Sequence, residues 1–130
     1  ISKAADYFRQ AIGKDSHYAP AYTKLAGAYL MLGNIGAIPK KESLRNATAL
    51  IDTALRLDPS FAAAHAERGW SLLLYDLDFD GAGLEFKRAV ELNPNSVEAR
   101  QGLGEYYLTM GLLQPAVQEM ERARQLDPWH

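Results

Sequence analysis

The sequence predicts an all-α fold, a superhelical solenoid in which antiparallel helix pairs stack on one another. Three segments that end in proline are alike: Ala54–Pro59, Ala89–Pro94 and Ala123–Pro128. Their prolines follow one another at intervals of 35 and 34 residues (59 to 94 and 94 to 128), a period typical of stacked helical repeats. Between them, apolar residues recur at i, i+3, i+4 and i+7, and no stretch shows the period of two expected of a strand.

The first three predicted helices include an irregular unit. Residues 2–14 form a helix that ends in a degenerate copy of the repeated segment, Ala11–Ser16, in which serine replaces proline. This copy lies 43 residues before the next (11 to 54), so we expect an insertion of about nine residues around Asn34–Ser43. Helices 18–32 and 40–57 flank the insertion. Their apolar stripes are Tyr22, Leu25, Ala26, Tyr29 and Leu30, then Leu44, Ala47, Ile51, Ala54 and Leu55.

The last four predicted helices form two further pairs. Asp80 is expected to accept the free amides at the start of one helix, and Asn95, three residues before Glu98, resembles a capping box. Each second helix is followed by a proline, which cannot continue it. These four helices are expected at residues 61–75, 80–92, 96–110 and 114–126.

Small residues mark the places where helices are expected to approach closely. A larger side chain there would push the stack apart. The small residues are Ala26, Ala47, Ala54, Gly69, Ala82, Ala89, Gly104, Ala116 and Ala123.

Length and composition limit what the chain can be. Its 130 residues (14.4 kDa) are enough for one domain and too few for two ordinary ones. Apolar residues make up 48% and charged residues 23%, which favours a folded chain over a disordered one. A formal net charge of -2 provides no basic field, so we predict no direct nucleic-acid partner.

The sequence also argues against disulfides and membrane spans. It has no cysteine, which excludes disulfides and thiolate sites and leaves the cellular compartment open. Its longest strongly apolar run, Leu72–Leu74, is far shorter than the roughly 20 residues of a spanning helix, so no membrane partner is expected. The chain begins at Ile1 without methionine, and we expect a fragment of a longer protein.

No constellation of residues predicts an enzyme, a cofactor or a metal site. The three histidines are far apart, and His65 is best interpreted as a residue that packs within a helix pair. The glycines of Gly81–Gly83 and Gly102–Gly104 lack the third glycine and the strand of a dinucleotide loop. We therefore predict no catalytic residue.

The segment Asp76–Gly81 resembles the first half of a calcium-binding loop. Its three aspartates alternate before a glycine, as in the first half of such a loop. The position of the closing bidentate acid holds Lys87, which removes two oxygens and adds a positive charge. We therefore interpret the segment as an acidic turn that ends in a helix cap at Asp80.

The pattern of the repeated unit resembles the tetratricopeptide repeat (TPR). The third unit carries it at Leu103, Gly104, Tyr107, Gly111, Ala116, Ala123 and Pro128. The departures include Arg68 in place of leucine, and Ile51 and Met120 in place of an aromatic residue. The resemblance implies about three and a half repeats and seven helices in a single TPR domain. Its expected parts are a half repeat (1–18), a repeat with the insertion (19–61) and two further repeats (62–96 and 97–130).

A narrower likeness concerns bacterial signalling proteins. The runs Tyr18–Tyr22 and Tyr75–Ala82, with the long connection around Pro39, are similar to TPR regions behind winged-helix DNA-binding, class III adenylate cyclase and protein-kinase domains. This likeness implies, as an alternative function, a regulatory or sensor region in transcription regulation or signalling.

The TPR resemblance implies a binding groove. In that family the first helix of each pair lines a concave face that binds a protein or peptide partner. Carried over by repeat position, the groove residues are Thr23, Lys24, Gly27, Met31, Ala66, Glu67, Trp70, Leu74, Gln101 and Glu105. The basic clamp with which chaperone-binding relatives hold a carboxylate is absent, because its places hold Thr23, Gly27, Glu98 and Gly102.

The expected groove is acidic with an apolar centre. Glu67, Glu98 and Glu105 stand against Lys24 alone, which favours an apolar or basic peptide segment. For Trp70 the alternative is simple packing against the neighbouring helix pair. A further alternative for the whole chain is self-assembly into a homo-oligomer, because the last helix offers Val117, Met120 and Leu126 with no polar capping helix after it.

Overall fold

The computed structural model describes residues 3–129, and within them it contains seven α-helices, one short π-helical segment and no strand. The π-helical segment, η1 (Leu72–Asp76), continues the fourth helix. The predicted all-α fold with seven helices is confirmed. The helices are α1 (Lys3–Lys14), α2 (Ala19–Asn34), α3 (Lys40–Leu57), α4 (Ala62–Ser71), α5 (Phe79–Leu92), α6 (Val97–Thr109) and α7 (Leu113–Leu126).

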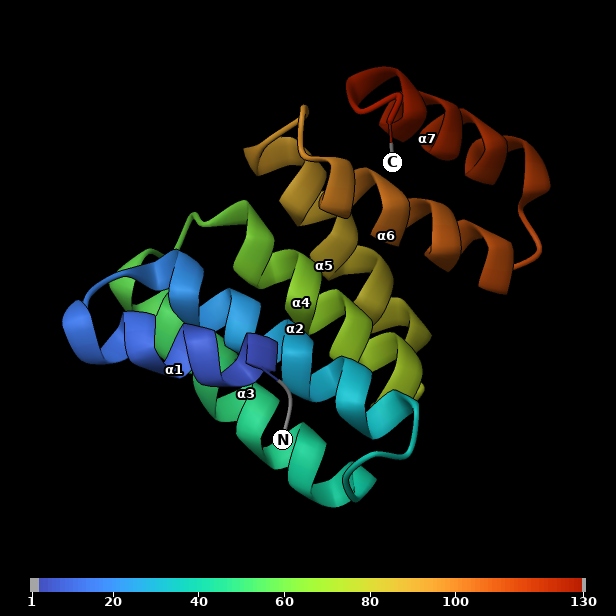
Figure 1. Ribbon diagram of the computed structural model, residues 1–130. Coiled ribbons are helices and arrows are strands. Elements are labelled where there is room, and N and C mark those ends of the chain that lie inside the picture. The colour runs from blue at the N-terminus through green and yellow to red at the C-terminus, as the bar shows by residue number, and fades with distance from the viewer. Residues whose placement is uncertain (1–2, 130) are drawn as a thin grey trace.

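Consecutive helices form a stack of antiparallel pairs (Figure 1). Helix α2 packs against α3, α4 against α5 and α6 against α7, while α1 packs against α2. The first helices of the pairs also contact one another, α2 with α4 and α4 with α6. The chain thus proceeds from the blue α1 end to the red α7 at the other end of the stack, and α2, α4 and α6 share one face.

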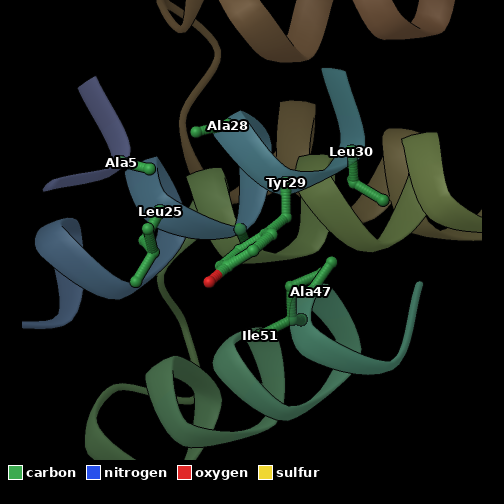
Figure 2. Packing of buried hydrophobic residues seen from close by; sticks show 8 residues of the cluster. Ala5, Leu25, Ala28, Tyr29, Leu30, Ala47 and Ile51 are labelled. Carbon is green, nitrogen blue, oxygen red and sulfur yellow. The ribbon is translucent and has the colours of Figure 1, made fainter. Parts of the chain in front are cut away.

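The core of the N-terminal part lies between α1, α2 and α3. Figure 2 shows the ring of Tyr29 extending from α2 beside Ala47 and Ile51 of α3. Ala5 of α1 belongs to the same cluster. Ala5 and Ala47 are completely buried. Small residues at these places let three helices share one cluster. Of the two, Ala47 was predicted from the sequence and Ala5 was not.

The core of the C-terminal part is built around Phe86 of α5. Its side chain is completely buried. Gly69 of α4 lies against the ring, because a Cβ added to it would be 2.7 Å from Cε1 of Phe86. A Cβ on Gly102 of α6 would also overlap this ring. Phe86 therefore fills a slot that two glycines on flanking helices leave open.

The insertion is tied to the rest of the stack by a small polar network. The Ser43 hydroxyl donates to the Tyr29 carbonyl oxygen (2.5 Å), and the Tyr75 hydroxyl donates to that of Leu30 (2.6 Å). The two hydroxyl oxygens are 3.1 Å apart. Gly33 lies where a side chain would collide with both. Through Tyr75, η1 is thereby held against the α2–α3 pair.

A short turn recurs at the end of four helices. In each case the side chain of an aspartate or asparagine accepts a hydrogen bond from the backbone N–H two residues later, at 3.0 to 3.3 Å. Such turns reverse the chain locally without help from the remaining structure. The accepting residues are Asp15, Asp58, Asn93 and Asp127.

Two predicted helix caps were wrong. Helix α5 is capped by Asp78, whose Oδ1 accepts from the Gly81 N–H at 3.0 Å, because Leu77 adopts a left-handed conformation (φ 53°) and starts the helix earlier. Asp80 instead lies in the first turn of α5. Helix α6 is capped by Ser96, which accepts from the Ala99 N–H at 3.1 Å. Asn95 precedes the capping residue by one position, and its backbone N–H donates to Asn93 Oδ1 in the turn after α5.

Candidate functional site

Two pockets open on the face formed by the first helices. The α2–α4 pocket has a volume of about 280 Å³. The α4–α6–α7 pocket has a volume of about 480 Å³. The α2–α4 pocket is lined by Gly27, Leu30, Met31, Asn34, Glu67, Trp70 and Leu74. The α4–α6–α7 pocket is lined by Trp70, Gln101, Glu105, Met120, Ala123, Arg124 and Asp127.

Trp70 of α4 is common to both pockets. Its indole also meets the ring of Phe86 edge to face, with 5.3 Å between the ring centroids. Part of its surface stays exposed. Trp70 therefore both packs between helix pairs and lines the two pockets.

The structure brings together seven of the ten predicted groove residues. Lys24 is exposed on the same face but lines neither pocket. The seven that line a pocket are Gly27, Met31, Glu67, Trp70, Leu74, Gln101 and Glu105.

Thr23 and Ala66 do not belong to the exposed surface, and here the prediction was wrong. They are only 3% and 2% exposed, and the Thr23 hydroxyl donates to the Pro20 carbonyl oxygen. Thr23 lies on α2 and Ala66 on α4, and each of these helices is packed against the next first helix of the stack. Gln101 has the same repeat position on α6, the last first helix, and is exposed. Repeat position alone therefore does not determine exposure.

Sequence reasoning missed the contribution of α7. Met120, Ala123 and Arg124 line the α4–α6–α7 pocket from that helix. The family pattern assigns the groove to first helices, and α7 is a second helix. Its inner side borders the pocket because, within residues 3–129, no further helix packs on it. The position of α7 as the last helix within residues 3–129 was the available signal.

The carboxyl group of Glu67 is the electrostatically unusual group of this face. Burial raises its pKa to about 7, while Lys24 lowers it and Glu98 raises it by smaller amounts. Gly27 gives the carboxylate room, since a Cβ there would be 3.0 Å from Glu67 Oε1. At neutral pH this group is therefore close to half ionised.

Glu67 also lacks a strong partner. Within residues 3–129, its carboxylate forms no hydrogen bond and no ion pair shorter than 4 Å, and its oxygens reach solvent. By contrast, Arg100 of α6 is held by Glu119 of α7 at 3.0 Å. A carboxylate in a largely apolar pocket that no cation contacts within 4 Å gains from a cationic ligand.

His65 lies away from both pockets and joins α4 to α5. Its Nδ1 is 2.7 Å from Glu85 Oε2, and its Nε2 is 2.9 Å from the Pro59 carbonyl oxygen. Both ring nitrogens are thus used within the helix pair, in agreement with the interpretation of His65 as a packing residue.

The acidic turn before α5 is a capping structure. The Asp78 carboxylate is occupied with the Gly81 N–H, and the Lys87 ammonium lies over the ring of Tyr106, 5.8 Å from its centroid. Across the part of the chain that the structure describes, no three histidine or acidic side chains converge as metal ligands. No helix among residues 3–129 is long and apolar enough to cross a bilayer.

Comparison with known proteins places the fold. Residues 71–128 match the family model described as tetratricopeptide repeat. A thermophilic TPR protein from Thermus thermophilus superimposes with a TM-score of 0.78 and 27% identity, over 97% of this chain and 65% of that one. The structure of MamA superimposes with a TM-score of 0.63 and 21% identity, over 95% of this chain and 67% of that one.

These neighbours show the architecture and leave the specific role open. No curated protein matches the chain. The chain spans less than two thirds of the Thermus protein's length. The likeness to winged-helix regulators and cyclases stays a prediction. Residues 71–128 thus match the tetratricopeptide repeat, and the chain has the same fold as the Thermus TPR protein.

Proposed function

We propose that this chain is a protein-interaction module, without catalytic activity of its own, that holds a peptide or an extended partner segment against the face formed by α2, α4 and α6. The observation that carries the proposal is the place of Trp70 between two pockets, of about 280 and 480 Å³. Tryptophan is enriched among the residues that dominate binding energies, particularly at the centre of an interface.

The surroundings of Trp70 suit an extended segment. Met31 and Leu74, on one side, are 57% and 42% exposed, so they offer apolar surface to a ligand without rearrangement. On the other side Gln101 and Glu105 are exposed polar groups. A segment that crosses Trp70 would thus place one side chain in each pocket, with polar groups available for its backbone.

The test is a peptide-array screen of the wild type beside Leu74→Ala, with Leu84→Ala as the matched control. Leu84 is 71% exposed on α5 and lines neither pocket. We expect binding to fall at least fivefold in Leu74→Ala, consistent with about 1 kcal/mol for an apolar contact, and to stay unchanged in Leu84→Ala. Circular dichroism should show that all three proteins remain helical.

Trp70→Ala is the stronger variant and needs more care. Because Trp70 also packs on Phe86, its removal destabilises the stack as well as the groove. Its binding is therefore measured at a temperature where its helical signal equals that of the wild type. Absence of binding by the wild type to every peptide, or equal binding by Leu74→Ala, contradicts the proposal.

Self-assembly is a second candidate, favoured by the exposed side chains of α7. Leu113 and Val117 are 66% and 61% exposed. Helical repeats normally cover such a surface with another repeat or a polar cap. Light scattering of the wild type and a Leu113→Ser/Val117→Ser variant tests this: a homo-oligomer that the variant loses supports it, and a strict monomer at high concentration refutes it.

A further inference from the structure

The α2–α4 pocket combines apolar walls with a single carboxylate. Met31 and Leu74 form exposed apolar walls, Leu30 is buried beneath them, and Trp70 closes one side. The Glu67 carboxylate lies against Gly27 in the same pocket. With about 280 Å³, the pocket is at the lower end of the size of small-molecule sites, which suits one long side chain.

This combination discriminates between classes of side chain. A neutral apolar side chain would bury Glu67 further and leave it without a partner, which is costly. An acidic one would be repelled by Glu67 and by Glu98 on α6. A lysine or arginine side chain fits both features, because its methylene stem packs on apolar surface while its cationic head reaches a carboxylate or the indole.

We propose that the α2–α4 pocket binds a lysine or arginine side chain of the partner segment, with the cation held by the Glu67 carboxylate and the stem by Met31, Leu74 and Trp70. This inference rests on the proposed function and adds the chemical class of the residue that is recognised. Lys24 on α2 is the cation that lowers the pKa of Glu67, and its exposed side chain forms no ion pair with Glu67 shorter than 4 Å within residues 3–129.

Proton binding competes with this cation. Because the pKa of Glu67 in the free protein is about 7, the carboxylate is mostly ionised at pH 8 and mostly protonated at pH 6. The charged groups that face it are Lys24 from α2 and Glu98 from α6. If only the ionised form binds, the affinity for a basic peptide falls roughly tenfold between pH 8 and pH 6.

The probes are matched pairs of fluorescein-labelled 12-residue peptides with one central lysine, or with norleucine in its place, in apolar and polar sequence contexts. Binding is measured by fluorescence anisotropy to the wild type, to Glu67→Gln and to Glu91→Gln. Glu91 is an exposed residue of α5 that lines neither pocket, so Glu91→Gln makes the same change of charge elsewhere.

We expect lysine peptides to bind the wild type at least tenfold more tightly than their norleucine partners at pH 8. Glu67→Gln should lose this preference and the pH dependence, whereas Glu91→Gln should keep both. Equal binding of the two peptides, or an unchanged preference in Glu67→Gln, overturns the inference and leaves the proposed function standing. Absence of binding by every peptide contradicts the proposed function itself, and this inference with it.

Discussion

The middle pair α4–α5 and the last pair α6–α7 have nearly the same sequence pattern and different surroundings. Phe86 of α5 and Met120 of α7 occupy the same repeat position, but Phe86 is completely buried and Met120 only partly. Gly83 of α5 is buried against Tyr106, whereas Val117, its counterpart on α7, is 61% exposed. A second helix is therefore fully covered only when another first helix follows it.

The same difference affects charged residues. Glu67 lies on α4, which has a first helix on either side, and burial raises the pKa of its carboxyl group to about 7. Glu105 lies on α6, which within residues 3–129 has such a neighbour on one side, and it is exposed. A first helix on either side thus goes with the burial that raises the pKa of Glu67.

The largest expected effect is the loss of Phe86. Phe86→Ala should lower the free energy of unfolding by about 3 to 5 kcal/mol, because it empties a slot closed by both Gly69 and Gly102. Met120→Ala should cost about 1 to 2 kcal/mol, since Met120 already has water on one side. Urea denaturation followed by circular dichroism measures both.

Phe86→Leu is included in case Phe86→Ala does not fold. It should cost less than Phe86→Ala and still more than Met120→Ala. Equal losses at the two repeat positions would contradict the view that a following helix completes the burial.

The next effect concerns the glycines that contact these side chains. Gly102→Ala should lower stability by about 2 kcal/mol, because its Cβ would collide with the rigid ring of Phe86. Gly104→Ala should be close to neutral. Its Cβ would be 3.0 Å from Cγ of the flexible Met120, and alanine favours a helix by roughly 1 kcal/mol over glycine.

A double variant sharpens this prediction. Combining Gly102→Ala with Phe86→Leu should cost less than the sum of the single changes, because the smaller side chain vacates the space that the new methyl group needs. Strict additivity in thermal unfolding would show that the ring is not the obstacle.

The third effect is the pH dependence of stability caused by Glu67. Its folded-state pKa is raised above the ordinary 4.5 to about 7, so the folded protein holds this proton more tightly than the unfolded chain. The stabilisation is complete below the ordinary pKa and is lost as the pH rises through about 7. Each pKa unit corresponds to about 1.4 kcal/mol, and Glu67 remains partly exposed, so we expect a loss on the order of 2 kcal/mol.

Glu67→Gln should remove this contribution, which makes the variant more stable than the wild type at pH 8 and similar to it at pH 5. Glu105→Gln is the control from the end pair and should follow the wild-type curve. Chemical denaturation at both pH values measures the free energy of unfolding. An equal change between pH 5 and pH 8 in the wild type and in Glu67→Gln would contradict the assigned pKa.

The smallest effect compares one substitution in the two second helices. Val90 of α5 is partly buried and packs against residues of α4 and α6. Val90→Ala should therefore cost about 1 to 2 kcal/mol, and Val117→Ala at most about 0.5 kcal/mol. A loss at Val117 as large as that at Val90 would show that α7 is covered in solution, and would favour self-assembly.

Much of the fold was predictable because the signals are local. The helices follow from apolar spacing, and the stack follows from the interval between the prolines. The caps were less predictable, because Asp78 and Asp80 are equally suitable residues for a cap. The choice between them depends on the left-handed conformation of Leu77, which follows from the π-helical end of α4.

The candidate site was only partly predictable. Repeat position predicted Glu67, Trp70 and Leu74 for the groove, and in the structure the three line the α2–α4 pocket. It could not show that Thr23 is buried, since that depends on the distance between neighbouring first helices. The contribution of α7 was missed for a similar reason, because α7 borders the pocket where no further helix packs on it within residues 3–129.

By itself, the sequence determined that this chain is a stack of seven helices in repeated pairs, because spacing and punctuation act over a few residues. The tertiary structure alone decided which side chains become core, pocket or surface. Phe86 and Met120 fit the same pattern, and what separates them is the presence of α6 beyond one helix and no further helix beyond the other within residues 3–129. Burial depends on neighbours that are distant in sequence, and it also raises the pKa of Glu67.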